Sequence, residues 1–442
     1  MDFLKKMVII SVDAMGASDL VGDLADTPTF EWLRREGTHI QNIEAIYPSL
    51  TYPSHTTLVT GEYPKTHGVI NNTKIQSNRM SPDWYWYKKD VLVPTLYELA
   101  QQAGMTTAAF LWPVTAKSGI DYNIAEIFPN RIWTNQVLVS LNASSPRFLL
   151  EMNHKYGHLR QGIKQPYLDD FITACAVDTL VTKKPDLTLI HLVDMDSMRH
   201  AHGVLSPEAE AAFLRQDRRI KDIINATKQA GTFDETVFVV LGDHYQIDVN
   251  KMIRLNHLFA EKGWSKVKKD GTIQANWQVY AKSCDGSCYI YVDQKASVNP
   301  AELFKELEKV EGVAKVYSTE EATAQGAAPN VTFMVEAKRG YYFIDDAAGP
   351  VNEPVNSKDI GQPERYRAVH GYSPQKQNYK TTVLFFGPGI RSGKVIDQAR
   401  LIDEAPTFAK ILGLTFPNPV AGQVLHEVFE REEGEPPSEV LE

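Results

Sequence analysis

The chain has 442 residues, of which 43% are hydrophobic and 23% are charged. These proportions are typical of a folded globular protein and exclude a mainly disordered, collagen-like or coiled-coil chain. The chain contains 46 Lys and Arg residues and 55 Asp and Glu residues, which gives a net charge of −9. We therefore expect neither a nucleic-acid duplex nor a membrane as partner. A small phosphorylated substrate in a local pocket is compatible with this balance.

Short apolar runs rich in β-branched residues predict buried strands of a parallel sheet. In chain order they are residues 7–12, 106–112, 187–193, 236–242 and 381–387. Helical patterns lie between them, and the segments 94–104 and 206–231 have Pro near the start and Gly at the end, as helices prefer. This alternation predicts an α/β fold with a mainly parallel sheet sandwiched by helices.

Residues 251–365 have a different pattern. Short strand-like pieces joined as hairpins surround one predicted helix at 300–312. We therefore expect a catalytic core of residues 1–250 and 366–430, with 251–365 as a smaller α+β insertion near the substrate mouth. The acidic, Pro-containing segment 431–442 is expected to be a flexible tail.

The three cysteines favour a reducing compartment. Cys284 and Cys288 flank an Asp-Gly-Ser sequence typical of a hairpin tip, and the sequence leaves open whether they pair. The first apolar run is too short for a signal peptide, and no window approaches 18 uncharged apolar residues. We expect a cytoplasmic protein.

Carboxylate and imidazole side chains follow three of the predicted strands. The carboxyl ends of parallel strands meet at one edge of a sheet, so these side chains are expected to share one site. A single Asp at this edge could equally be a helix N-cap. Several unpaired carboxylates close together repel each other, however, and therefore favour a bound cation. Oxygen and nitrogen ligands together favour zinc or a similar divalent metal over calcium. The residues are Asp13, Asp194, Asp196, His200, Asp243 and His244.

Spacing constrains how these side chains meet. Asp196 and His200 are four residues apart, so one helical turn places them on the same side. Asp243 and His244 are adjacent and would point to opposite faces of a strand, so both reach one site only from a turn.

The segment 47–72 is rich in Ser, Thr, Pro and Gly, although it lies between ordered elements. A loop that leads into a helix N-terminus offers free backbone N–H groups to an anion, and the hydroxyls are candidate nucleophiles. The segment resembles the nucleophile segment of the nucleotide pyrophosphatase/phosphodiesterase (type I phosphodiesterase) family of the alkaline phosphatase superfamily. Four later stretches resemble motifs of that family in the same order: 110–113, 196–203, 243–244 and 370–372.

The resemblance implies an alkaline phosphatase-like core that holds two divalent metal ions per chain, most plausibly Zn²⁺. Thr51 would be the nucleophile and form a phosphothreonine-type intermediate, while Asn72 and the Thr51 backbone N–H would bind the phosphoryl oxygen. The implied ligands of one metal are Asp13, Asp243, His244 and Thr51, and those of the other are Asp196, His200 and His370.

The expected activity is hydrolysis of phosphodiester or nucleotide pyrophosphate bonds in a small substrate such as a nucleotide. The alternatives are a phosphonoacetate hydrolase-like or phosphomonoesterase activity on the same two-zinc site, and a non-catalytic, metal-stabilised binding protein. The last should have lost a ligand or the nucleophile, and neither is missing.

A preference for diesters is predicted because Lys65 is the only Lys or Arg in the segment 47–72, and a monoester dianion calls for more positive charge. Arg199 would change this prediction if it turned toward the site. The aromatic run 84–87 is either a stacking platform for a base or a packing cluster.

Overall fold

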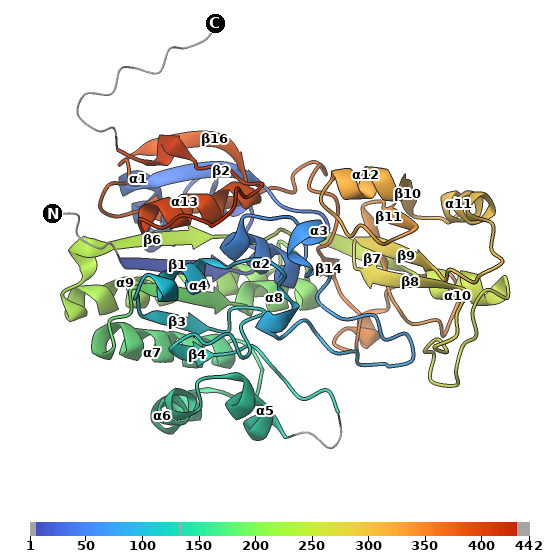
Figure 1. The fold of residues 1–442 in the computed structure, drawn as a ribbon, viewed down its shortest axis with the longest axis horizontal. Coiled ribbons are helices and arrows are strands. Elements are labelled where there is room, and N and C mark those ends of the chain that lie inside the picture. Colours follow the sequence, from blue (N-terminus) through green and yellow to red (C-terminus); the bar gives the residue numbers. More distant parts are fainter. Residues whose placement is uncertain (1–5, 132–134, 431–442) are drawn as a thin grey trace, which may run out of the picture.

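The computed structural model describes residues 6–131 and 135–430, so the predicted tail at 431–442 lies outside the described residues. Figure 1 shows a larger α/β lobe and, beside it, a smaller lobe coloured yellow to orange. Within the described residues, no helix combines the length and apolar content needed to cross a membrane.

The larger lobe is built on a sheet of eight strands in the order β16-β2-β15-β6-β1-β5-β3-β4. The central strand β1 pairs in parallel with β5 and β6 (Figure 1). The strands are β1 (Lys6–Val12), β2 (Thr38–Glu44), β3 (Thr107–Phe110), β4 (Tyr122–Ile124), β5 (Leu187–Leu192), β6 (Thr236–Leu241), β15 (Thr381–Phe386) and β16 (Lys394–Arg400).

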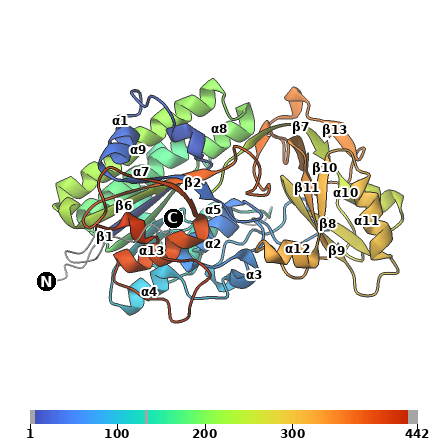
Figure 2. The ribbon, with the colours of Figure 1, turned by 90° about the horizontal axis from the view of Figure 1, so that it is seen from above.

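Helices cover both faces of this sheet (Figure 2). Successive side chains of a strand point to opposite faces, so β1 contributes to two cores. Val8 and Ile10 pack with α1, α7 and α9, whereas Met7 and Ile9 pack with α2, α4 and α13. The helices of the lobe are α1 (Pro28–Glu36), α2 (Thr51–Thr60), α3 (Pro64–His67), α4 (Leu96–Gln102), α5 (Gln136–Ala143), α6 (Pro146–Tyr156), α7 (Tyr167–Thr182), α8 (Asp194–His202), α9 (Pro207–Ala230) and α13 (Glu404–Ile411).

The prediction of a mainly parallel sheet between helices is therefore confirmed, but the run 381–387 is not a parallel strand. The strand β15 is antiparallel to both neighbours, β6 and β2. Its apolar composition reflects burial on both faces and carries no information on direction, which is set by how the chain returns from the smaller lobe.

The smaller lobe contains two sheets. One has the order β10-β11-β9-β8, and the other has the order β12-β7-β13 with β14 paired to β7. Their strands are β7 (Ile247–Ile253), β8 (Val279–Cys284), β9 (Ser287–Val292), β10 (Val313–Ser318), β11 (Phe333–Ala337), β12 (Gly340–Phe343), β13 (Asn352–Pro354) and β14 (Ala368–Val369), and the helices are α10 (Leu255–Glu261), α11 (Pro300–Glu308) and α12 (Thr319–Ala324).

Two details of this lobe differ from the sequence-based expectation. The strand β12 is not a hairpin partner of its neighbours in sequence but pairs in parallel with β7. The strand β7 begins before residue 251, and its partner β14 lies beyond residue 365. The sheet of the smaller lobe therefore includes residues on both sides of the predicted insertion 251–365. At the β8–β9 hairpin, Cys284 and Cys288 are buried free thiols.

Candidate active site

Thr51 is the first residue of α2, so its hydroxyl lies at the N-terminus of a helix. The backbone N–H groups there have no partner within the helix, and the helix dipole favours negative charge. The side chain is almost buried, and Thr51 Oγ1 lies 3.0 Å from Nε2 of His244. Among the candidate hydroxyls of this segment, Ser49 instead bonds to the Tyr372 carbonyl and the Tyr379 hydroxyl.

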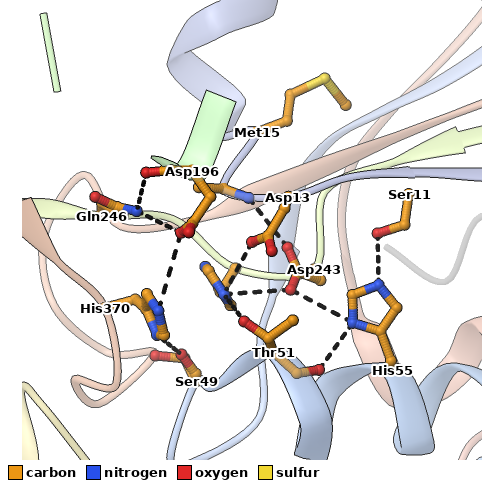
Figure 3. A network of polar contacts seen from close by, with 12 residues as sticks. Ser11, Asp13, Met15, Ser49, Thr51, His55, Asp196, Asp243, Gln246 and His370 are labelled. Carbon is orange, nitrogen blue, oxygen red and sulfur yellow. Dashed lines mark hydrogen bonds and ion pairs between the residues drawn. The ribbon is translucent and has the colours of Figure 1, made fainter. Parts of the chain in front are cut away.

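Three side chains from two strand ends converge beside Thr51. Asp13 follows β1, and Asp243 and His244 follow β6 in a bend, as their adjacency requires. Their potential ligand atoms all lie within 4.8 Å of one another. Nε2 of His244 lies 3.3 Å from Oδ1 of Asp13 and 3.2 Å from Oδ2 of Asp243, and Figure 3 shows the two carboxylates turned toward Thr51.

The electrostatics of this first group fit a cation. Burial raises the pKa of Asp13 well above its usual range, and the nearby Asp196 adds to the rise. Burial and the proximity of Asp13 raise the pKa of Asp243 in the same way. Within the described parts of the chain, Asp13 Oδ1 and Asp243 Oδ2 are buried without a hydrogen-bond partner. Burial lowers the pKa of His244 well below its usual range, so a neutral imidazole supplies no compensating charge.

A second group lies next to the first. Asp196 and His200 come from one turn of α8, and His370 follows β14. His200 Nε2 is 3.4 Å and His370 Nε2 is 3.9 Å from Oδ1 of Asp196. The rings of His370 and His244 stack with centroids 3.9 Å apart, so the two groups adjoin.

Backbone carbonyls orient both imidazoles of the second group. Nδ1 of His200 donates to the Ala368 carbonyl at 2.7 Å, and Nδ1 of His370 donates to the Ser49 carbonyl at 3.2 Å. The second nitrogen of each ring, Nε2, is thereby left as a lone-pair donor facing Asp196, which is the usual arrangement of metal-binding histidines.

The pKa shifts in this group differ from those in the first. Burial acts to raise the pKa of Asp196, but His200 and His370 outweigh it and hold that pKa well below its usual range. Burial acts to lower the pKa of His200, but Asp196 outweighs it and the pKa is raised. Burial lowers the pKa of His370 to about 4. Both groups thus offer buried carboxylates and imidazole nitrogens to a divalent cation, which would displace the proton that Asp196 stabilises on His200.

Two polar residues beside the groups were not singled out by the sequence. His191, inside β5, lies with Nε2 3.1 Å from Asp13 Oδ2 and Nδ1 3.1 Å from the Leu111 carbonyl. Gln246 Nε2 donates to Oδ1 of Asp196 (Figure 3). A histidine in an otherwise apolar strand was the available signal for His191; no local pattern marks Gln246.

The side chain of Asn72, from the loop after α3, lies beside the N-terminus of α2. Its Oδ1 accepts the backbone N–H of Tyr52 at 2.9 Å, which fixes the amide and leaves Nδ2 as a free donor. The Thr51 backbone N–H and Asn72 Nδ2 have no hydrogen-bond partner among the described residues, so both are available to an anionic oxygen.

Other polar residues near the motifs are engaged elsewhere. Arg199 pairs with Asp19, with NH2 2.6 Å from Oδ1, and does not turn toward the site. Asp194 pairs with Arg215 and Arg219. His55, by contrast, borders the first group: its buried Nδ1 lies 2.8 Å from the Thr51 carbonyl oxygen and 3.6 Å from Oδ2 of Asp243 (Figure 3).

A cleft of about 460 Å³ opens next to the N-terminus of α2. Asn72 and Trp84 from the larger lobe and Asp285 and Tyr366 from the smaller lobe line it. Within the aromatic run 84–87, Trp84 packs on the Tyr52 ring at 5.2 Å, whereas Trp86 is buried. Trp86 therefore belongs to a packing cluster, whereas Trp84 lines the cleft.

The sequence matches the family model of the type I phosphodiesterases / nucleotide pyrophosphatases over residues 7–373. The chain belongs to this family. Both groups of potential ligands, Thr51 and Asn72 fall within the matched range.

Curated relatives within the family are longer than this chain. Human ectonucleotide pyrophosphatase/phosphodiesterase family member 1 is 25% identical over 402 residues, which cover 88% of this chain and 38% of the human protein. Venom phosphodiesterase 2 of Crotalus adamanteus is 22% identical over 251 residues, covering 54% of this chain and 26% of the venom protein. The chain thus aligns with about a third of the length of these relatives.

Solved structures of the family share the fold. Human ectonucleotide pyrophosphatase/phosphodiesterase 5 superposes with a TM-score of 0.68 at 18% identity, covering 97% of this chain and all of that chain. An inactive Thr-to-Ala variant of murine ectonucleotide pyrophosphatase/phosphodiesterase 5, in complex with AMP, superposes with a TM-score of 0.67 at 17% identity over 96% of this chain and all of that chain. The larger and smaller lobes together therefore adopt the fold of this family.

Proposed function

We propose that the protein is a metal-dependent hydrolase of phosphodiester or nucleotide pyrophosphate bonds, with Thr51 as its nucleophile. The observation that carries this proposal is the position of Thr51 Oγ1, at a helix N-terminus and 3.0 Å from His244, beside two adjoining groups of buried carboxylate and imidazole donors. Membership of the family supports it.

In the proposed reaction the Thr51 hydroxyl loses its proton to solvent and Oγ1 forms a bond to phosphorus. The bond to one ester oxygen breaks, and that oxygen takes up a proton from solvent. The leaving alcohol departs, and the other ester group remains on the phosphorus bound to Thr51. Water then breaks the Thr51–phosphorus bond and releases a phosphomonoester. The Thr51 backbone N–H and Asn72 Nδ2 hold one phosphoryl oxygen through both steps, where developing negative charge strengthens these hydrogen bonds.

The residues present fit two divalent metal ions, and their mixed oxygen and nitrogen donors favour Zn²⁺. Asp13, Asp243, His244 and Thr51 would hold one, and Asp196, His200 and His370 would hold the other. When bound, such ions make an oxygen ligand more acidic and offset negative charge on attacking and leaving oxygens. The raised pKa values of Asp13 and Asp243 and their unpartnered oxygens support this assignment.

We propose further that diesters are preferred over monoesters. A monoester dianion needs an additional cationic group; three cations near the site are paired with acids or carbonyls, and Arg79, which also lines the cleft, is exposed to solvent. Arg199 is held by Asp19, Lys282 by Asp345, and Lys65 by the Thr323 carbonyl. The neutral amide of Asn72 suits the single charge of a diester.

The deciding measurement is kcat/KM of zinc-loaded protein on bis-p-nitrophenyl phosphate, p-nitrophenyl phosphate, a nucleoside triphosphate and phosphonoacetate. We expect a diester or pyrophosphate to be turned over faster than p-nitrophenyl phosphate. A clear preference for the monoester or for phosphonoacetate would reassign the substrate class and keep the Thr51 nucleophile. No turnover of any of the four would favour a non-catalytic protein.

A further inference from the structure

The β8–β9 hairpin of the smaller lobe reaches the candidate active site. At its tip, the Gly286 N–H donates to the His370 carbonyl at 2.8 Å, and Ser287 Oγ donates to the Gly371 carbonyl at 2.7 Å. Gly371 has a φ of +80°, and a Cβ there would lie 1.7 Å from the Cys284 carbonyl oxygen. The tip is therefore packed directly on the loop that carries His370, so the hairpin has a fixed position relative to the second group.

Asp285 is the first residue of the two-residue turn at this tip and is partly buried. It has a φ of +60°, a conformation that Asp and Asn adopt more readily than other non-glycine residues. Its backbone N–H donates to Ser283 Oγ at 2.9 Å. Its carboxylate lines the cleft and makes no hydrogen bond or ion pair with any residue that the structure describes. Burial raises the pKa of Asp285 to about 6.

The cleft around Asp285 carries an excess of acid. Its lining has five carboxylates and three cationic side chains. Lys282 is paired with Asp345, and Arg365 with Asp346, so these pairs compensate each other. Glu364 makes no ion pair with a described residue, and burial raises its pKa to about 7. Asp270 and Asp285 also have no ion-pair partner among the described residues, but Asp270 is exposed, as is the third cation, Arg79, so solvent screens their charges more than that of Asp285.

The direction of displacement places the leaving group against this carboxylate. Thr51 Oγ1 lies against the first group, beside His244. In an in-line displacement the leaving oxygen departs on the side opposite the nucleophile, which is the side of the adjoining second group. Tyr366 lies there, with its ring 4.5 Å from that of His200, and it lines the same cleft as Asp285.

We propose that Asp285 is a specificity-determining residue that selects phosphodiesters whose leaving alcohol carries an ammonium group and disfavours polyanionic leaving groups such as pyrophosphate. This inference rests on the proposed hydrolase function and narrows it to a substrate class. The aromatic face of Tyr366 adds a surface that an ammonium group favours. Trp84, on the Asn72 side of the cleft, would contact the ester group that stays on phosphorus.

The test uses thymidine 5′-phosphodiesters that release a 4-nitrophenol substituted with either a trimethylammoniomethyl or a sulfomethyl group. We expect the wild-type kcat/KM to favour the cationic leaving group, and Asp285→Asn to reduce the cationic-to-anionic ratio by on the order of ten-fold, because one short-range charge interaction is lost. Asn keeps the shape and tolerates the positive φ. Asp270→Asn is the matched control, since Asp270 lines the outer part of the same cleft and is exposed, and the ratio should stay within about two-fold.

A binding measurement separates this inference from the proposed function. Calorimetric titration of the cationic diester into Thr51→Ala protein, with and without Asp285→Asn, needs no turnover. Weaker binding only in the Asp285 variant supports the inference, even if the wild type hydrolyses no diester and the proposed function fails. An unchanged ratio together with unchanged affinity in the Asp285 variant overturns it.

The source of such an alcohol is tested separately. Ethanolamine release is compared between glycerophosphoethanolamine in solution and vesicles of phosphatidylethanolamine. Release from the former supports a soluble diester and release from the latter a lipid headgroup. If the wild type hydrolyses other diesters but releases ethanolamine from neither, the result counts against the inference.

Discussion

His191 Nε2, in β5, lies 3.1 Å from Oδ2 of Asp13, the residue that follows the neighbouring parallel strand β1. The other nitrogen of His191 is anchored on the Leu111 carbonyl. The contact fixes which oxygen of Asp13 is directed at the first group, since Oδ1 is left without a hydrogen-bond partner. A buried histidine that makes no contact with substrate can therefore control the geometry of a proposed ligand.

We expect His191→Phe to weaken metal binding about 10- to 100-fold, which is the usual cost of losing a group that orients a ligand. Chelator competition monitored by metal content measures this. His257→Phe is the control, because His257 lies on α10 and bonds to the Ala347 carbonyl, outside both groups. Equal losses in both variants would contradict an orienting role for His191.

Thr51→Ala should lower kcat by at least about 10³-fold while metal content is largely retained, because a nucleophile is removed and the buried carboxylates and imidazoles remain. Ser54→Ala serves for comparison, since Ser54 Oγ is buried without a partner one turn later in α2. Its turnover should stay within a few-fold of wild type. The reverse pattern would show that the nucleophile had been misassigned.

Metal binding near neutral pH should release protons. Burial and mutual repulsion raise the pKa values of Asp13 and Asp243, so the metal-free protein retains protons that a cation displaces. Affinity should consequently fall as the pH is lowered. Calorimetry of zinc binding in buffers of different ionisation enthalpy counts the protons, and elemental analysis should approach two metal ions per chain. Binding without proton release would contradict this account.

Glu404, the first residue of α13, belongs to neither group of potential ligands and offers a prediction on stability. Both carboxylate oxygens are buried without a partner, and burial raises the pKa well above its usual range. The folded protein keeps a proton that the unfolded chain loses near the ordinary Glu pKa. The free energy of unfolding should therefore fall as pH rises above that value, by at most about 1.4 kcal/mol per pH unit from this group.

Replacement by Gln tests this, since Gln is uncharged at every pH and similar in shape. The melting temperature of Glu404→Gln relative to wild type should increase between pH 5 and pH 8. A constant difference across this range would mean that Glu404 does not titrate on unfolding.

Local sequence patterns were sufficient to predict the α/β architecture of the larger lobe. The apolar runs that became β1, β5 and β6 are buried on both faces, so burial alone makes them recognisable. The proposed ligands were visible for the same reason: Asp13, Asp196 and Asp243 follow those strands, and parallel strands bring their carboxyl ends to one edge. The family motifs added His370, which no strand-end argument had reached.

Only the tertiary structure decided the remaining features. The direction of β15 depends on the route of the chain through the smaller lobe, and the pairing of β12 with β7 joins residues about 90 apart. The place of Asp285 beside the second group depends on a hairpin more than 80 residues before His370. Such contacts bring together segments that are far apart in sequence, so no periodicity, cap or turn signal encodes them. They form only when distant strands and loops pack and bury their shared surface.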